Sequence, residues 1–268
     1  MQIVEVTDFA VRSAVLHLTR PGTPLRFEVF PMVHVAEPAF FAAVADRLRH
    51  CDLIVAEGIG GPEPPPAEID LEIASLNWPG LEVDGRSEPR RRWDVTSAIT
   101  ASYEIPARSA RLGLVVDTID YAGLGVPVLC PDMTDAEFDA GWRELPGWQR
   151  GLALAAFPLM GLHLLAFGSR RSLARGIQVD DTDWRERRAR GTSAQDNLLT
   201  LIGDKRDELL MTALDAVHDT CSGDAITVGV VYGAFHVPAI THGLHALHGY
   251  SARGAEWLTV FHLEQPGP

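Results

Sequence analysis

Two stretches of the sequence resemble each other, and they decide the fold. Residues 27–35 read FEVFPMVHV, and residues 229–237 read GVVYGAFHV. In each stretch a run of β-forming residues ends in an aromatic residue, and a histidine follows four positions later: His34 in the first copy and His236 in the second. Apolar runs of this kind are typical of strands buried in a sheet. A single histidine after a strand is most often a satisfied polar residue, but its recurrence indicates two equivalent positions.

Each stretch is followed by a helical pattern and then by a further strand. After the first copy, Pro38–His50 has apolar residues at helical spacing and Leu53–Ala56 is an apolar β run; after the second, Pro238–Leu247 and Glu256–Leu263 repeat this order. Strand, helix and strand in succession predict parallel strands joined by a right-handed crossover. We therefore predict an α/β fold with a central mixed, largely parallel sheet, built from two pseudo-symmetric β-α-β halves.

Three other patterns extend this prediction. Val11–Leu18 and Leu25–Phe30 are runs of β-formers separated by a turn-forming Arg-Pro-Gly-Thr, which predicts a hairpin. Asn197–Asp219 has the spacing of a long amphipathic helix, and Ala225–Tyr232 is an almost continuous apolar strand.

The middle of the chain reads as a helical insertion. At 268 residues the chain is near the length at which single hydrophobic cores stop growing, so we expect one domain over 1–268, with a helical insertion over about 69–200 that forms a lid. Within it, residues 151–168 contain no formal charge. We expect a buried helix or an apolar lid over a pocket. A membrane span is less favoured, because the stretch has the minimum length and contains Pro158 and His163.

Composition excludes some partners. Asp and Glu number 36 against 23 Lys and Arg, a net charge of −13, which would repel a nucleic-acid backbone. Three scattered cysteines exclude a disulfide framework and fit a reducing cytoplasm. The first residues lack the basic and then apolar pattern of a signal peptide. We therefore expect a cytoplasmic protein without a nucleic-acid partner, with membrane contact disfavoured and a homodimer left open.

Four residues are the candidate site. His34 and His236 should lie at the same edge of the sheet, where parallel strands end and a crevice can form. Glu57 directly follows the strand Leu53–Ala56 and should emerge there too, unless it caps a neighbouring helix. Arg206 interrupts the apolar stripe of its helix, so its guanidinium needs an anion, which Glu57 or a substrate oxyanion could supply, unless it reaches the rim.

These residues carry a resemblance to a known family. The G-x-x-H motif Gly233–His236, Glu57 at its strand end and the helix segment Lys205–Met211 resemble the Tiki/TraB/PrgY group, which is related to erythromycin esterase and ChaN-like folds. The segments Tyr103–Tyr121 and Pro131–Phe138 are similar to an uncharacterised bacterial branch of that group. The resemblance covers the chain roughly from Phe27 onward.

The resemblance implies a fold of two pseudo-symmetric β-α halves and, in some members, hydrolysis of peptide or ester bonds, which is metal-dependent in Tiki-type proteases. It implies His34, Glu57, Arg206 and His236 as the site residues. One position departs from the pattern: Pro31 stands where the first motif has glycine, and it removes a backbone donor. The first half-site could therefore be altered or silent.

The hypothesis is a hydrolase acting on an apolar peptide or ester. His34 or His236 would accept a proton, Glu57 would act as base, and Arg206 would stabilise the oxyanion. His34, Glu57 and His236 could instead bind a divalent metal ion and leave a position open for water. Two alternatives remain: a non-catalytic binding or regulatory protein on the same scaffold, and a biosynthetic lyase or cyclase that uses the same acid-base residues.

Overall fold

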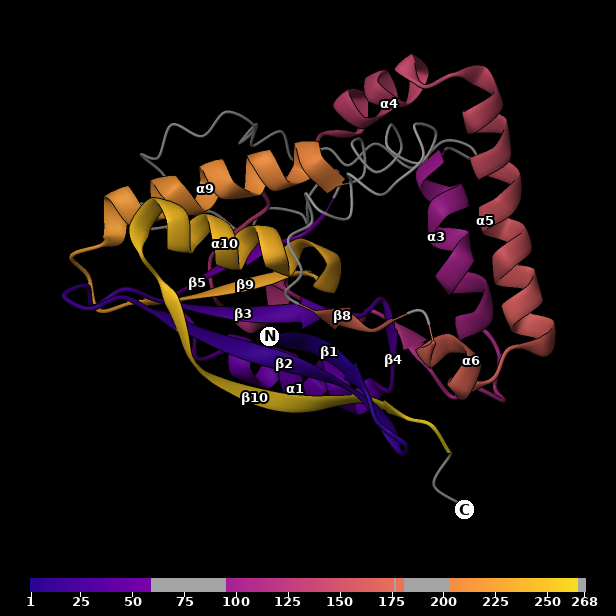
Figure 1. Ribbon diagram of the computed structural model, residues 1–268, viewed down its shortest axis with the longest axis horizontal. Helices are drawn as coiled ribbons and strands as arrows, with labels where there is room; N and C mark the ends of the chain where they lie inside the picture. Colours follow the sequence, from indigo (N-terminus) through magenta and orange to yellow (C-terminus); the bar gives the residue numbers. More distant parts are fainter. Residues whose placement is uncertain (59–94, 176, 181–202, 265–268) are drawn as a thin grey trace.

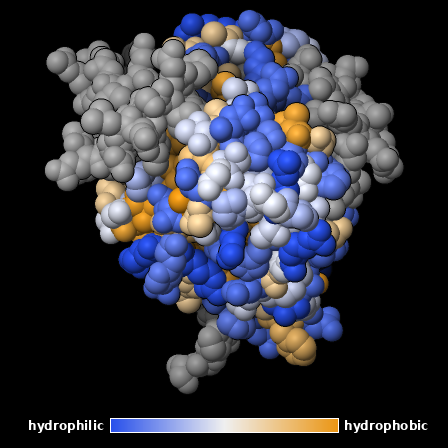
Figure 2. Space-filling model, turned by 90° about the vertical axis from the view of Figure 1, so that its left-hand side faces the viewer, coloured by the Kyte–Doolittle hydropathy of each residue, from blue (hydrophilic) through white to orange (hydrophobic). Residues whose placement is uncertain are grey.

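A computed structural model describes residues 1–58, 95–175, 177–180 and 203–264. Within these ranges the chain forms an α/β fold with a mixed sheet of eight strands, partly parallel, and seven α-helices (Figure 1). The fold class predicted from the sequence is confirmed. One end of the molecule, shown in Figure 2, is mainly hydrophilic with scattered apolar residues.

The sheet has the order β7-β5-β9-β3-β2-β1-β8, and β10 pairs with β2. Its strands are β1 (Gln2–Val6), β2 (Ala10–Thr19), β3 (Arg26–Met32), β5 (Leu53–Ala56), β7 (Val128–Leu129), β8 (Val179–Asp180), β9 (Thr227–Gly233) and β10 (Ser251–His262). Two short strands, β4 (Val35–Ala36) and β6 (Val115–Val116), form a separate antiparallel pair.

The two resembling stretches become neighbouring parallel strands. β9 lies between β3 and β5 and is parallel to both, with Pro31 opposite Tyr232 and Ala56 opposite Val231. β2 and β3 form the predicted antiparallel hairpin. Because parallel strands end at one edge, the residues after β3, β5 and β9 meet there, as the sequence predicts.

The two β-α-β units differ from the expected parallel pairs. β3 and β5 are parallel, but β9 separates them, and β10 runs in the direction of β9 while pairing antiparallel with β2. The connection from β3 to β5 and the connection from β9 to β10 thus run toward opposite edges of the sheet. With right-handed connections, their helices must then cover opposite faces. α10 (Val237–His248) accordingly lies beside α9 (Lys205–Cys221) on one face, and α1 (Pro38–Leu48) lies on the other (Figure 1).

The described part of the insertion is mainly helical, although it also contributes the strands β6, β7 and β8. It contains α3 (Val95–Ala107), α4 (Asp135–Glu144), α5 (Gly147–Phe167) and α6 (Arg170–Ala174), and α3 and α5 stand side by side beyond the sheet (Figure 1). Residues 69–94, 176 and 181–200 of the predicted insertion, and the start of the predicted helix from Asn197, lie outside the described residues. The lid remains a prediction.

Of the two alternatives predicted for residues 151–168, a buried helix or an apolar lid, the buried helix is wrong. These residues form a helix, but only 11% of the apolar stretch in α5 is buried, because α5 packs on α3 along one side and not within the core. By length and composition α5 is the helix among the described residues that could cross a membrane.

Candidate active site

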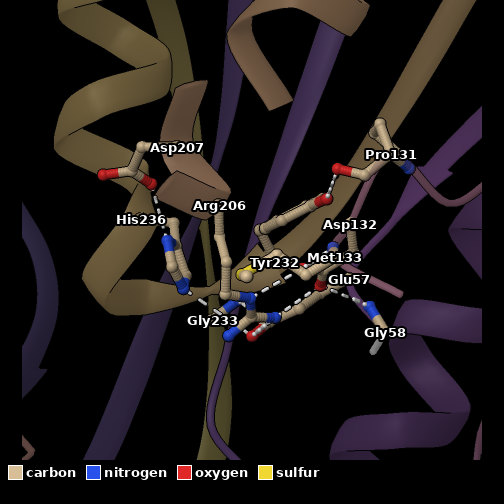
Figure 3. Close-up of polar contacts among 10 residues, drawn as sticks. All are labelled: Glu57, Gly58, Pro131, Asp132, Met133, Arg206, Asp207, Tyr232, Gly233 and His236. Carbon is tan, nitrogen blue, oxygen red and sulfur yellow. Dashed lines mark hydrogen bonds and ion pairs between the residues drawn. The ribbon is translucent and has the colours of Figure 1, made fainter. Parts of the chain in front are cut away.

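Three of the four predicted site residues meet at the edge where β5 and β9 end. Glu57 follows β5, Arg206 is in the first turn of α9, and His236 ends a short 3-10 helix, Ala234–His236, directly after β9. Their side chains point toward one another (Figure 3). The prediction that Arg206 faces inward to an anion is confirmed, because its side chain is buried against Glu57.

Glu57 is held from both sides of its carboxylate. Arg206 Nη2 donates to Oε1 at 2.8 Å, and the backbone N–H of Gly233 donates to Oε2 in a short hydrogen bond. A Cβ on residue 233 would lie 3.0 Å from Oε2, so glycine permits this close approach of the β9 backbone. The Glu57 side chain keeps 17% of its surface exposed, so the carboxylate remains accessible at one side.

Asp132, which follows β7, completes the ion network. Arg206 Nε donates to its Oδ1 at 2.8 Å, and Nη2 donates to its Oδ2. The backbone N–H groups of Gly58 and Met133 also donate to this carboxylate, whose side chain is only 1% exposed. The guanidinium therefore forms a bidentate pair with Asp132, a geometry in which arginine binds carboxylates strongly, and it also bonds Glu57.

The network keeps Glu57 ionised. Burial raises the pKa of Glu57, but Arg206, then His236 and His34, and the Gly233 N–H outweigh burial and lower this pKa to about 2. Burial lowers the pKa of Arg206, but its bonds to Asp132 and Glu57 raise it well above its ordinary value. At neutral pH the pair is charged, and Glu57 is a weak base.

His236 lies between two carboxylates. Its Nδ1 is 2.6 Å from Asp207 Oδ1, and its Nε2 is 3.7 Å from Glu57 Oε1. The ring is buried and packs edge-on against Tyr232 and Phe235. Because an ionised carboxylate only accepts hydrogen bonds, Asp207 favours the proton on Nδ1 and leaves the lone pair on Nε2, toward Glu57. Burial raises the pKa of Asp207, and His236 acts in the opposite direction.

His34 lies at the margin of this group. It follows β3 at the same edge of the sheet, but its side chain is exposed and its ring stacks on Tyr103 of α3, with centroids 4.8 Å apart. It is near enough to lower the pKa of Glu57. Asp117 is on the same side: burial raises its pKa, its bond to the Ile119 N–H and then His34 lower it, and Glu57 raises it.

The geometry gives little support to a metal bound by His34, Glu57 and His236. In the described ranges there is no group of three or more His, Cys, Asp or Glu side chains that could hold a metal ion. The Glu57 oxygens accept from Arg206 and Gly233, and His236 Nδ1 faces Asp207. A cation would compete with the guanidinium, so these residues as arranged do not fit a metal centre. The metal remains a prediction, to be tested directly.

Sequence reasoning missed Asp132 and Asp207. Asp132 comes three residues after a short apolar strand, and this strand-end position is the same signal that identified Glu57. Asp207 is adjacent to Arg206, but about 100° around the helix, so the apolar stripe alone does not indicate which side chain it meets.

Comparison of the chain with protein-family models, curated proteins and solved structures finds no match. The family resemblance therefore depends on the short sequence motifs alone, and it remains a hypothesis.

Proposed function

We propose that this protein is a hydrolase of ester or peptide bonds in which His236 is the general base. The observation that carries the proposal is the arrangement of Asp207, His236 and Glu57. The imidazole of His236 is buried, with the Asp207 carboxylate beside Nδ1 and the Glu57 carboxylate near Nε2. A carboxylate on Nδ1 orients the ring and stabilises the imidazolium that forms when Nε2 takes a proton.

Glu57 and Arg206 have different tasks in this proposal. With its pKa lowered to about 2, Glu57 is too weak a base to take a proton from water, but its carboxylate can orient an attacking water and stabilise the charged His236. Arg206 uses Nε and Nη2 on Asp132 and Glu57. We therefore assign Arg206 to holding Glu57 in place, rather than to the oxyanion.

The reaction then follows from these positions. His236 Nε2 removes a proton from a water that Glu57 orients, the hydroxide attacks the carbonyl carbon, and the protonated His236 returns the proton to the leaving alcohol or amine. His34, exposed at the same sheet edge, can contact the substrate.

The test uses a matched pair of Asp–His contacts. Asp215 and His248 also form a 2.8 Å contact, which joins α9 to α10 outside the Glu57–Arg206 network. Wild type, Asp207→Asn and His236→Gln are assayed on acyl esters of increasing chain length and on apolar peptides, beside Asp215→Asn and His248→Gln. We expect the site variants to lose about 100-fold or more in kcat/KM and the matched variants to stay close to wild type. Equal activity in all five proteins would refute the hydrolase.

The same assay tests the metal. Metal analysis of the purified protein and assay after chelation are compared with the untreated protein. Retained turnover supports the metal-free His236 site, whereas loss on chelation and recovery with a divalent ion would return His34, Glu57 and His236 to the role of ligands.

Binding without turnover is the second candidate. Its support is the departure at Pro31: this residue is buried in β3 and its carbonyl accepts from Ser13 Oγ at 2.6 Å, so the first motif is built into the sheet. Ligand affinity that falls in His236→Gln, with no turnover of any substrate by wild type, would favour this candidate.

A further inference from the structure

The helix α5 exposes more apolar surface than any helix of a closed core would. Leu159 is 63% exposed and Phe167 is 77% exposed, and further large apolar side chains along the helix are also exposed: Trp148, Leu152, Leu154, Met160 and Leu162. Residues 151–168 carry no formal charge. The end of the molecule seen in Figure 2 is, by contrast, mainly hydrophilic.

The exposed side chains surround most of the helix. Only a narrow stripe packs inward: Ala153 is buried, and Gly161 touches α3 so closely that a Cβ there would lie 2.4 Å from the carbonyl oxygen of Ala101. At about 100° per residue, the exposed apolar side chains occupy well over half of the circumference. One folded partner covers one stripe of a helix, whereas lipid can surround all of the remaining surface.

Both ends of α5 are tied to the body of the protein. At the N-terminal end, Ala153 packs in a cluster with Phe138, Trp142 and Met133. After the C-terminal end, Arg170 donates to Glu37 Oε1 at 2.5 Å and to the His262 carbonyl of the sheet. A helix held at both ends by one body cannot cross a bilayer, but it can lie along its surface.

The polar groups at the ends of α5 suit this position. Arg111 Nη2 donates to the carbonyls of Leu165, Ala166 and Gly168 at the C-terminal end of the helix. These carbonyls therefore keep a hydrogen-bond donor when lipid replaces the surrounding water. Trp148 is exposed near the start of the helix, and tryptophan is enriched where membranes meet water.

We propose that the outward side of α5 inserts into the interfacial region of a lipid bilayer and holds the protein on the membrane surface. The insertion is driven by burial of apolar side chains and not by charge, because the protein carries a net charge of −13. Binding is therefore expected on uncharged phosphatidylcholine vesicles, without gain from anionic lipid and without loss in high salt.

The experiment is flotation of the full chain with phosphatidylcholine vesicles. Wild type is compared with the double variant Leu159→Glu/Leu162→Glu and with two controls that place Glu at equally exposed apolar positions elsewhere, Leu247→Glu (59% exposed) and Phe9→Glu (80% exposed). We expect the double variant to lose about tenfold or more of its vesicle affinity and both controls to bind like wild type. Circular dichroism checks that each variant is folded.

Three outcomes overturn the proposal. The first is absence of wild-type flotation, and the second is equal loss in the control variants. The third is that a second copy of the chain, and not lipid, covers the exposed side of α5. The wild type would then be dimeric without lipid, the double variant would be monomeric, and neither protein would float. Glu57→Gln should float like wild type, so failure of the proposed hydrolase would leave this result unaffected.

Discussion

His34 and His236 stand at the ends of neighbouring parallel strands in similar sequence surroundings, yet their environments differ. His236 is buried and faces carboxylates on both sides, whereas His34 is exposed and stacks on Tyr103. The strands are also offset: Pro31 pairs with Tyr232, although the sequence similarity aligns Pro31 with Gly233.

The difference shows which part of a site a repeated strand can supply. Strand pairing brings both imidazoles to one edge of the sheet, but the partner of each imidazole comes from another element. α9 supplies Asp207 beside His236, and α3 supplies an aromatic ring beside His34. The repeated strands therefore determine where the two imidazoles lie, whereas α9 and α3, which are not part of the repeat, determine which side chains contact them.

The largest effect on stability should come from removing the positive charge of Arg206, which lies in the network around His236. Arg206→Met leaves the carboxylates of Glu57 and Asp132 buried without their counter-charge, so we expect it to lower the free energy of unfolding by about 3 to 5 kcal/mol. Urea denaturation measures it. Arg171→Met is the matched control, because Arg171 pairs with Glu264 at the surface and should cost about 1 kcal/mol or less. A similar loss in both variants would show that the buried network is not special.

The next largest effect should be the pH dependence of stability, which arises from Glu57 beside His236. The pKa of Glu57 is lowered from 4.5 to about 2 in the folded protein, so its ionisation stabilises the fold fully above pH 4.5, and this contribution is lost as the pH falls toward 2. Its size at neutral pH is about 3 kcal/mol.

The measurement is denaturation of wild type and Glu57→Gln at pH 5 and pH 3. The difference between the two proteins should fall by roughly half over this interval. Glu256→Gln is the control, because the pKa of Glu256 is also lowered, through its bond to Arg47, but at an exposed position. A constant difference for Glu57→Gln would contradict the lowered pKa.

Much of this arrangement could be predicted from local pattern. The strand predicted over Leu53–Ala56 has the same bounds as β5, and Glu57 emerges from it at the predicted edge. Arg206 interrupts an apolar stripe, and a buried guanidinium needs an anion wherever the helix packs. These inferences need only the periodicity of one element and the rule that parallel strands end together.

The remainder depends on contacts between distant elements. That Asp132 shares Arg206 with Glu57 requires β7 to lie beside β5, which two apolar residues in a short strand do not specify. The exposure of α5 could not be predicted either, because an uncharged apolar stretch has the same composition whether protein or another medium surrounds it.

The smallest expected effect is at His34, and it tests the comparison most directly. His34→Ala removes an exposed ring with one aromatic contact, so the free energy of unfolding should change by about 0.5 kcal/mol or less. His236→Ala removes the partner of a buried carboxylate, Asp207, and should cost about 1 to 3 kcal/mol. Urea denaturation of the two variants under one condition gives both values. Equal losses would mean that the two strand ends are energetically equivalent, and the assignment of the proton-transfer role to His236 alone would lose its structural basis.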